Sequence, residues 1–529
     1  MLVGGSPVRL LRLTPAGARQ VAGWFSGTPL PAADAPRLLA RRLLDAGLAH
    51  PDHNPQPVYR TVPADSPPPT APVGGPTVTV VIPVRDRHQE LARCLAALRQ
   101  PPTADPDAAR LPAIVVDDAS ADPAAIAAIA AAHGARVIHR PVNGGPGAAR
   151  NTGLAAASTD LVAFLDSDCV PPPGWLDRLL PHFADPAVGA VAPRIVPHEA
   201  GDSWLARYEG ASSTLDMGAR PSVVRPGARV SYVPGAALVV RRAAAGNGFA
   251  GDMVVGEDVD FVWRMTAAGW TVRYEPAATM GHDHRVRFRP WFARRADYGT
   301  SAAALEQRHP GAVRPLYASW WTVGAWAAAL SGRPLTATAL TAAATALLAR
   351  RLAPITGDPR PFPTPRSCST ADDADIRPDV ACTYRRIAPP STRDNEPPSS
   401  PPDNSKKRAA QNRRPAWRAE AWRLAARLAG GGTLAAGRPI GSALTRTWWP
   451  LAIPAAIAFP RLRRPVAALI LVPPLLDWAD RRPPLDPARY VAARLLDDAA
   501  YSLGVWHGCL QRRTIAPILP VIGKRPPNT

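Results

Sequence analysis

Three acidic motifs in this chain each adjoin a hydrophobic run: Asp117-Asp118, Asp166-Ser167-Asp168 and Glu257-Asp258. Carboxylates gathered at the ends of buried strands repel one another, and a divalent cation shared with a diphosphate would neutralise them. Taken singly, each motif is better explained as a polar strand end or a helix cap. All three occur together, however, and the glycine-rich segment GGPGAARN separates the first two. This pattern favours one site for a metal ion and a phosphate-bearing ligand.

The segments before the acids have the composition of buried strands. They are VTVVIPV (78–84), AIVVDDAS (113–120), ARVIHR (135–140) and LVAFLDSDCV (161–170), and helical patterns such as HQELARCLAALRQ alternate with them. Strands alternating with helices predict an α/β fold with a mostly parallel sheet and helices on both faces. Ligands bind such sheets beyond the carboxyl ends of the strands, which is where the acids fall.

The same segments resemble the motifs of glycosyltransferase family 2, which has the GT-A fold. In order, they are VTVVIPVRDR, VVDDAS, GGPGAARNTGL, FLDSDCVPPPGWL and VGEDVDFVWRM. Matching motifs in the family's order make the resemblance specific. It implies a metal-dependent, inverting transferase that uses a nucleoside-diphosphate sugar, with its GT-A catalytic domain at residues 77–315.

The resemblance also implies which residues bind the donor. Asp118 meets the nucleotide base, and Asp166 lies near the ribose or the ion. The other positions carried over to the nucleotide-sugar site are Pro83, Arg85, Asp117, Arg150 and Asn151.

For the metal and the chemistry, the resemblance implies that Asp168 binds Mg²⁺ or Mn²⁺ together with Asp166, and that His282 closes this metal site, with His284 as its rival. The cation absorbs the charge that appears on the leaving diphosphate. Asp258 is the candidate general base for the acceptor hydroxyl on the opposite face of the sugar, and Glu257 orients it. A single displacement of this kind inverts the anomeric carbon.

The flanking segments narrow the expected acceptor. Residues 1–55 resemble the small, winged-helix-like peptide-recognition domains of modified-peptide pathways, and residues 56–76 form a proline-rich linker. The tail LLDDAAYSLGVWHGCLQRR is similar to that of the mycofactocin-biosynthesis glycosyltransferases. This resemblance implies that a hexose, glucose from a UDP donor, is attached to the peptide-derived redox cofactor mycofactocin or its precursor.

Two alternatives stay open at this point. One is a family 2 enzyme acting on a cell-wall or lipid-linked saccharide, and the other is an inactive GT-A scaffold with a peptide-binding N-terminal domain. The Gln-x-x-Arg-Trp motif of processive polysaccharide synthases is absent, which argues against a polymerising channel.

Residues after the catalytic block predict a helical, partly hydrophobic region. The hydrophobic stretches at 316–353 fit either a membrane-embedded hairpin or buried alanine-rich helices. Residues 354–416 lack any apolar period and predict a disordered insertion. Within the helical region 417–529, the short, proline-containing runs 448–460 and 465–478 favour a segment that lies on a membrane surface over one that spans it.

Charge and cysteine usage set the remaining expectations. The net charge of +20 fits phosphate-bearing partners or an anionic membrane surface, but it also fits a general bias towards arginine. Because no nucleic-acid-binding motif accompanies the charge, we expect no nucleic-acid partner. The five cysteines show no CxxC spacing and are expected to be thiols. The N-terminus has no secretory pattern, which predicts a protein in the cytoplasm or at the cytoplasmic face of the membrane.

Overall fold

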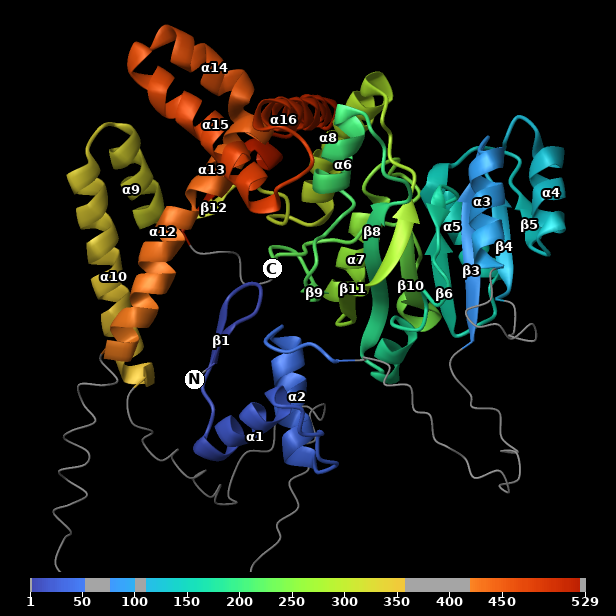
Figure 1. The fold of residues 1–529 in the computed structure, drawn as a ribbon, viewed down its shortest axis with the longest axis horizontal. Helices are drawn as coiled ribbons and strands as arrows, with labels where there is room; N and C mark the ends of the chain where they lie inside the picture. The colour runs from blue at the N-terminus through green and yellow to red at the C-terminus, as the bar shows by residue number, and fades with distance from the viewer. Residues whose placement is uncertain (1, 53–76, 100–110, 357–418, 524–529) are drawn as a thin grey trace, which may run out of the picture. The chain divides into compact units, whose positions relative to one another are not determined.

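The computed structural model describes residues 2–52, 77–99, 111–356 and 419–523, and Figure 1 draws their elements. They fall into two compact units, one made of residues 1–333 with 435–529 and the other of residues 334–434. The predicted linker at 56–76 lies outside the described residues, as does the predicted insertion from residue 357 onward.

The N-terminal segment forms an antiparallel hairpin followed by two helices. Its elements are β1 (Leu2–Gly4), β2 (Arg9–Leu11), α1 (Pro15–Phe25) and α2 (Asp34–Asp45). The Thr14 side chain accepts a hydrogen bond of 3.1 Å from Gly17 N, which caps α1. The likeness to a winged helix stays a prediction.

Among the described residues, nine strands form one sheet: β3 (Val78–Val84), β4 (Ala113–Asp117), β5 (Arg136–His139), β6 (Leu161–Leu165), β7 (Cys169–Val170), β8 (Val188–Pro197), β9 (Ser222–Val224), β10 (Ala237–Arg241) and β11 (Thr271–His282). The order is β5-β4-β3-β6-β10-β8-β11-β7, and β9 pairs with β11. The pairs among β5, β4, β3 and β6 are parallel, as predicted, but β10 is antiparallel to both of its neighbours. The sheet is therefore mixed rather than mostly parallel.

Helices cover both faces of this sheet, as the alternating pattern predicted. The elements that complete this part are α3 (His88–Leu98), α4 (Pro123–Ala132), α5 (Gly145–Ala156), η1 (Leu180–Ala184), α6 (Trp204–Ser212), η2 (Arg242–Ala244), α7 (Glu257–Ala267) and α8 (Phe288–Arg308). Along β3, Val80 and Ile82 enter one core with Leu91 of α3, while Val81 enters the other with Ala149 of α5. Both faces of β3 are buried, because successive strand residues point to opposite sides.

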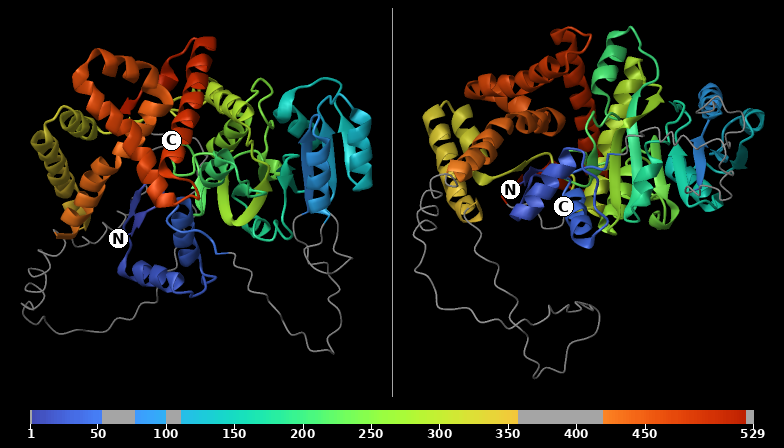
Figure 2. Two further views of the ribbon diagram at one scale, coloured as in Figure 1. Left: turned by 45° about the horizontal axis from the view of Figure 1, so that its top comes forward. Right: turned by 60° about the horizontal axis from the view of Figure 1, so that its bottom comes forward.

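The C-terminal helix α16 (Pro487–Gln511) packs along α8, and the two helices lie side by side in the views of Figures 1 and 2. Glycines permit this close approach. A Cβ on Gly299 would lie 2.1 Å from the Tyr501 carbonyl oxygen, and one on Gly504 would lie 1.9 Å from the Ala296 carbonyl oxygen. The packing joins the C-terminal part of the chain to α8.

Buried polar contacts hold the same packing. On α16, Asp497 accepts a 3.0 Å hydrogen bond from the Tyr208 hydroxyl and forms an ion pair of 3.1 Å with Arg295 Nε. The neighbouring Asp498 accepts a hydrogen bond of 2.6 Å from the Thr445 hydroxyl. The two acids of the LLDDAAYSLG segment therefore tie α16 to α6, α8 and the segment around Thr445.

The other described elements are helical except for a short parallel pair. In the first unit they are β12 (Tyr317–Ala318), α9 (Trp320–Leu330), α13 (Gly437–Ala443), η4 (Leu444–Trp448), α14 (Trp449–Ala458), α15 (Pro460–Arg481), η5 (Ala516–Ile518) and β13 (Val521–Ile522), with β12 pairing β13. The second unit contains α10 (Pro334–Thr356) and η3 (Ala426–Gly431), and α12 (Gly432–Ala435) ends at the boundary between the units.

In the second unit, Ala349 and Leu352 of α10 pack against Leu424 and Ala425. Of the helices in the described ranges, none combines the length and the apolar character needed to cross a membrane. Cys94, Cys169 and Cys509 are buried free thiols, and Cys368 and Cys382 lie outside the described residues.

Candidate functional site

A cavity of about 630 Å³ opens where the carboxyl ends of β3, β4 and β6 meet the start of β10. Residues of α5, α7 and α8 complete its wall, together with Arg446 of η4 and Tyr501 of α16. The cavity brings together most of the predicted site residues: Pro83, Arg85, Asp118, Arg150, Asp166, Asp168, Glu257 and Asp258.

On the predicted nucleotide side, the Asp118 carboxylate lies between β4 and the start of α5. It accepts backbone hydrogen bonds from Gly144 N at 3.0 Å and Gly145 N at 2.7 Å, and it contacts the Arg140 guanidinium. Gly145 has φ of +81°, a left-handed conformation that glycine adopts without strain. The GG pair of the sequence motif therefore fixes the Asp118 side chain at the cavity.

Asp117 is not brought into the cavity. It is buried beneath it, where it accepts a 3.0 Å hydrogen bond from Ser120 N and lies 2.9 Å from His139 Nδ1. Burial would raise the pKa of Asp117, but the hydrogen bonds from Ser120 and His139 hold that pKa below its usual value. These contacts fix the turn that follows β4.

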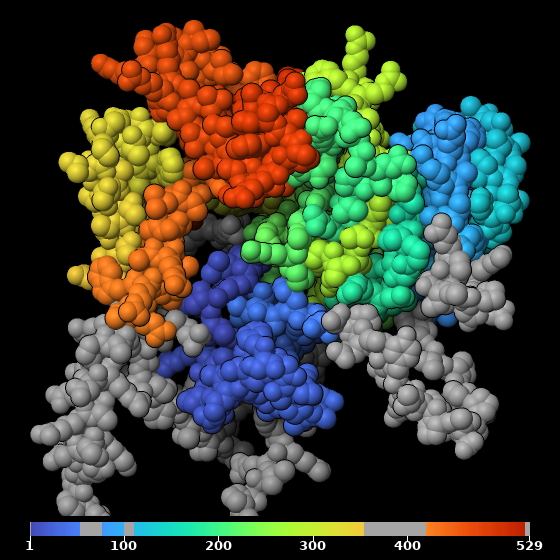
Figure 3. All heavy atoms as spheres, viewed as in Figure 1, coloured from blue at the N-terminus to red at the C-terminus, as the bar shows by residue number. Residues whose placement is uncertain are grey.

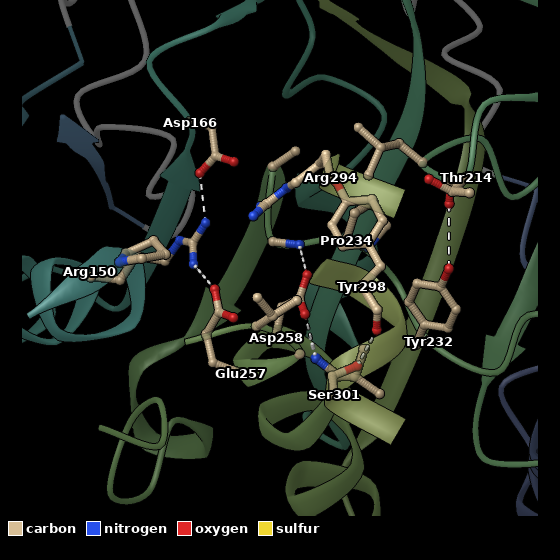
Figure 4. Close-up of a pocket in the computed structure, with 18 of the residues that line it drawn as sticks. Arg150, Asp166, Thr214, Tyr232, Pro234, Glu257, Asp258, Arg294, Tyr298 and Ser301 are labelled. Atoms are coloured by element: carbon tan, nitrogen blue, oxygen red, sulfur yellow. Dashed lines mark hydrogen bonds and ion pairs between the residues drawn. The ribbon is translucent and has the colours of Figure 1, made fainter. Parts of the chain in front are cut away.

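Arg150 of α5 is buried and joins two of the acidic motifs, as Figure 4 shows. Its Nη2 donates to Asp166 Oδ1 at 2.6 Å, and its Nη1 donates to Glu257 Oε1 at 2.9 Å. Burial opposes the positive charge, but the two carboxylates outweigh it and raise the pKa of Arg150. Arg150 therefore stays charged and links the end of β6 to the start of α7.

The next residue, Asn151, lies outside the cavity wall. Its amide nitrogen donates to Phe249 O at 2.9 Å, and its amide oxygen accepts from Phe249 N at 2.8 Å. These two bonds anchor the loop that leads to α7.

The pairing of β7 with β11 places Asp168 beside His282. His282 is directly opposite Cys169 in this antiparallel register, and His282 Nε2 lies 3.4 Å from Asp168 Oδ1. Burial would raise the pKa of Asp168, but His282 and Arg87 outweigh it and hold that pKa below its usual value. His284 faces away, with Nδ1 3.6 Å from Glu209 Oε2, and burial together with the charge of His282 lowers its pKa to about 4.

These side chains fit a divalent cation. The buried Asp168 Oδ1 has no hydrogen-bond partner among the described residues, and His282 Nε2 lies 3.4 Å from it, which is close enough for one ion to contact both atoms. A carboxylate and an imidazole form a donor set that Mn²⁺ accepts, and a cation on a nucleotide takes further ligands from phosphate and water. The described part of the chain contains no group of three or more His, Cys, Asp or Glu that could hold a metal without such outside ligands.

Asp258 stands at the first turn of α7, which Gly256 precedes. Gly256 has φ of +82°, and a Cβ there would lie 2.8 Å from the Ser301 Cβ, so glycine is needed on both grounds. Asp258 Oδ2 accepts a hydrogen bond of 2.7 Å from Gly235 N, just before β10. The carboxylate is therefore fixed between β10 and α7, with its side chain at the cavity (Figure 4).

Glu257 gives the site a pH-dependent stability. Burial and the neighbouring charge of Asp258 raise the pKa of Glu257 from its ordinary 4.5 to about 7, although Arg150 opposes them. The folded state then binds more protons than the unfolded state between these two values. The contribution of this group to the free energy of unfolding is therefore present below pH 4.5 and lost as the pH rises towards 7.

We expect Glu257→Gln to remove this dependence, because the amide does not ionise but keeps an oxygen for Arg150. The difference in free energy of unfolding between variant and wild type should change by up to about 3 kcal/mol between pH 4.5 and 7. Urea unfolding followed by tryptophan fluorescence measures it. Parallel stability curves over that range would contradict the assignment.

Several cavity residues have no counterpart among those predicted from sequence. Arg294 and Tyr298 come from α8 and Tyr232 from the loop before β10, while Arg446 and Tyr501 come from the C-terminal region. The Arg446 guanidinium lies 4.3 Å from the centroid of the Tyr501 ring. Among the residues labelled in Figure 4, Asp258 lies between the Arg150 ion pairs and the two tyrosines 232 and 298. Tyr501 lies in the tail LLDDAAYSLGVWHGCLQRR, but the resemblance of that tail implied no role for it.

Comparison with known proteins shows the family of this chain. The family model Glycosyl transferase family 2 matches residues 79–245. The pre-mycofactocin glycosyltransferase of Mycobacterium tuberculosis is 38% identical over 532 residues, covering 98% of this chain and 94% of that protein. Glycosyltransferase AglE of Haloferax volcanii is 26% identical over 40% of this chain and 71% of its own length.

Among solved structures, the mannosyltransferase PcManGT from Pyrobaculum calidifontis, in complex with GDP-Man and Mn²⁺, is 22% identical and covers 62% of this chain and 86% of that one. The TM-score of 0.36 is too low to support an inference from that likeness. The family model and the relative matched over nearly its full length agree, and this chain belongs to glycosyltransferase family 2.

Proposed function

We propose that this glycosyltransferase moves a hexose, glucose, from a nucleoside-diphosphate sugar to mycofactocin or its peptide-derived precursor, with inversion at the anomeric carbon. The observation that carries the proposal is the single cavity in which Asp118, Asp168 and Asp258 meet. The near full-length identity to a pre-mycofactocin glycosyltransferase supports the choice of acceptor. The reaction takes place in the cytoplasm or at the cytoplasmic face of a membrane.

For the donor, we assign the base to Asp118 and the diphosphate to the end of β6. Asp168 and His282 would hold a divalent cation, Mn²⁺ or Mg²⁺, with Asp166 beside them. When bound, such an ion supplies positive charge that stabilises the leaving diphosphate. Arg150 keeps Asp166 in position, because the guanidinium is paired on its other side with Glu257.

Asp258 is our candidate base for the acceptor hydroxyl. As the acceptor oxygen forms its bond to the anomeric carbon, the bond from that carbon to the β-phosphate oxygen breaks. The nucleoside diphosphate leaves with the electron pair of that bond, and the hydroxyl proton passes to Asp258. Gly235 N donates to Asp258 Oδ2 at 2.7 Å and Val259 N donates to Oδ1 at 2.8 Å, so both carboxylate oxygens have a fixed direction. Attack opposite the leaving group gives the inverted product.

The tyrosines of the cavity suit the acceptor. Tyr232, Tyr298 and Tyr501 line the cavity. In Figure 4, Tyr232 and Tyr298 lie beyond Asp258, on the side away from the Arg150 ion pairs. Stacked guanidinium and phenol groups bind planar and hydroxyl-rich molecules well. The N-terminal hairpin and helices, which we interpret as the winged-helix-like unit, would recognise the peptide part of the acceptor or its carrier.

A substitution at Tyr501 tests the acceptor side. We expect Tyr501→Ala to raise the KM for the acceptor about tenfold, the size of a lost stacking contact, and to leave the KM for the donor unchanged. Tyr501→Phe keeps the ring over Arg446 and should retain most of the acceptor affinity. Initial rates at varied acceptor and donor concentrations measure both constants. Equal changes in the two KM values would contradict an acceptor role.

The proposed function is tested by comparing two acceptors in separate incubations. Purified protein is incubated with UDP-glucose, Mn²⁺ and either the mycofactocin precursor or a lipid-linked saccharide, and product masses are recorded. We expect hexose additions to the precursor. Hexose added only to the saccharide would favour the cell-wall alternative. Hexose added to neither acceptor would contradict the proposal.

A further inference from the structure

The helices α14 and α15 present an unusual number of large apolar side chains to the outside. None of the residues of α14 is buried. The exposed fractions of Leu451, Ile457 and Phe459 are 57%, 69% and 62%. Leu462, Leu471, Val472, Leu475 and Leu476 of α15 are also exposed. In Figure 3 the orange part of the chain, which includes α14 and α15, stands at the surface of the face shown.

The unpaired charges of this helix pair are basic. α15 carries the acids Asp477 and Asp480 at its C-terminal end, where they pair with Arg481 and Arg438, whereas residues 437–476 contain five arginines and no aspartate or glutamate. Three of the arginines, Arg461, Arg463 and Arg464, lie at the start of α15 immediately after the exposed Phe459. All three are exposed, and within the described ranges none of them forms an ion pair. Arg463 instead donates to the Ala456 and Ile457 carbonyl oxygens at the end of α14.

We propose that α14 and α15 form a docking surface that lies on an anionic lipid bilayer. Apolar side chains beside unpaired arginines are the composition of helices that rest in the headgroup region, where the guanidinium groups reach lipid phosphates. The proposal concerns a surface-lying pair, because Pro465, Pro473 and Pro474 and the arginines interrupt the apolar length of α15.

The charge of the surface favours a lipid bilayer over a second copy of the chain as the partner that covers it. A second copy of the chain would place the same arginines against each other on a two-fold interface, and the two acids of α15, Asp477 and Asp480, already pair with Arg481 and Arg438. A lipid surface rich in phosphate supplies the opposite charge over the whole helix pair.

The position of the surface also has a consequence for the enzyme. α15 packs against α13 and α16, and α16 carries Tyr501 into the cavity. Docking would therefore hold the membrane close to the helix that forms the acceptor wall, without covering any residue to which we assign catalysis.

Vesicle binding tests the proposal without depending on sugar transfer. The full-length protein is sedimented with vesicles of phosphatidylcholine alone or with phosphatidylglycerol added. We expect strong binding only to the mixed vesicles and a decline as salt is raised. The double variant Ile457→Asp with Phe459→Asp should bind at least about tenfold more weakly, because two apolar anchors become anions. The double variant Arg461→Gln with Arg464→Gln should lose about fivefold per arginine.

The matched control is Leu510→Asp, at an exposed leucine near the end of α16 that is not part of α14 or α15, with an exposed fraction of 75%. It should bind vesicles like the wild type. All variants should transfer sugar to a water-soluble acceptor at the wild-type rate, which shows that they fold. Equal binding by wild type and the aspartate variant would overturn the proposal. So would a concentration-dependent dimer that the aspartate variant abolishes while neither protein binds vesicles, because the surface then serves a second copy.

Discussion

Replacing Asp258 by Asn is expected to lower kcat about a thousandfold while leaving donor binding unchanged. Loss of a positioned general base costs about 10² to 10⁴ in rate. Asparagine keeps the size of the side chain and an oxygen that can accept from Gly235 N, so the cavity retains its shape. The amide group replaces the second oxygen, which accepts from Val259 N, and the capacity to take the acceptor proton is lost. This loss affects the transition state rather than the bound ground state, and kcat should fall without a matching change in donor affinity.

Steady-state rates and calorimetry with UDP separate these two effects. The matched control is Asp260→Asn on the same helix. Asp260 is fully buried and pairs with Arg264 and His309, outside the cavity wall, so its loss should affect stability more than kcat of the folded enzyme. If Asp258→Asn turned over at nearly the wild-type rate, another group would be the base. If it lost donor binding as well, Asp258 would have a structural role.

Replacing Asp168 by Ala is expected to weaken UDP binding in Mn²⁺ by at least about a hundredfold. The carboxylate and His282 are the paired side chains that fit a cation here, and the variant retains only the imidazole. Loss of groups that merely orient a ligand already costs 10- to 100-fold in metal affinity, and loss of a ligand itself costs more. Without the ion, the diphosphate would lie beside Asp166, and the Arg150 guanidinium that pairs with Asp166 is shared with Glu257.

Titration calorimetry with and without a chelator measures the metal-dependent part of the affinity. The variant should bind UDP with the same weak affinity in both conditions. Asp177→Ala serves as control, because Asp177 is an exposed acid shortly after the same strand and lies outside the cavity wall. Metal-dependent UDP affinity that persists in Asp168→Ala would rule out this ligand assignment.

The sequence was informative where local pattern decides the structure. The buried, β-branched runs before the acids became β3, β4 and β6, and parallel pairing then placed Asp118 and Asp168 at one end of the sheet. The antiparallel direction of β10 was not predicted, because a short apolar strand has the same sequence pattern whether it pairs in a parallel or an antiparallel direction. Its register matters, since it presents Gly235 to Asp258.

It was harder to predict which of two neighbouring residues in a motif faces the cavity. Asp117 ends β4 and Asp118 follows it, so their side chains point to opposite sides, and only Asp118 faces the cavity. Arg150 and Asn151 are likewise adjacent on α5, and one turn of helix cannot direct both to the same side. Spacing along the chain identified these motifs but not the face on which each residue lies.

The C-terminal contribution to the cavity could not be predicted from sequence. Tyr501 reaches the cavity because α16 crosses α8 through Gly299 and Gly504, two positions about two hundred residues apart, and such close approach leaves no periodic signal. The resemblance of the tail indicated the expected acceptor. The packing role of Asp497 and Asp498 follows only from their buried partners, Tyr208 and Thr445, which lie on other elements.

The anomeric configuration of the product tests the central claim most directly. Wild-type protein is incubated with UDP-glucose, whose glucose is α-linked, together with Mn²⁺ and the mycofactocin precursor, and the product is analysed by nuclear magnetic resonance. A single displacement at the cavity, with Asp258 taking the acceptor proton, predicts a β-linked hexose. An α-linked product, or no hexose on the precursor, would contradict the account.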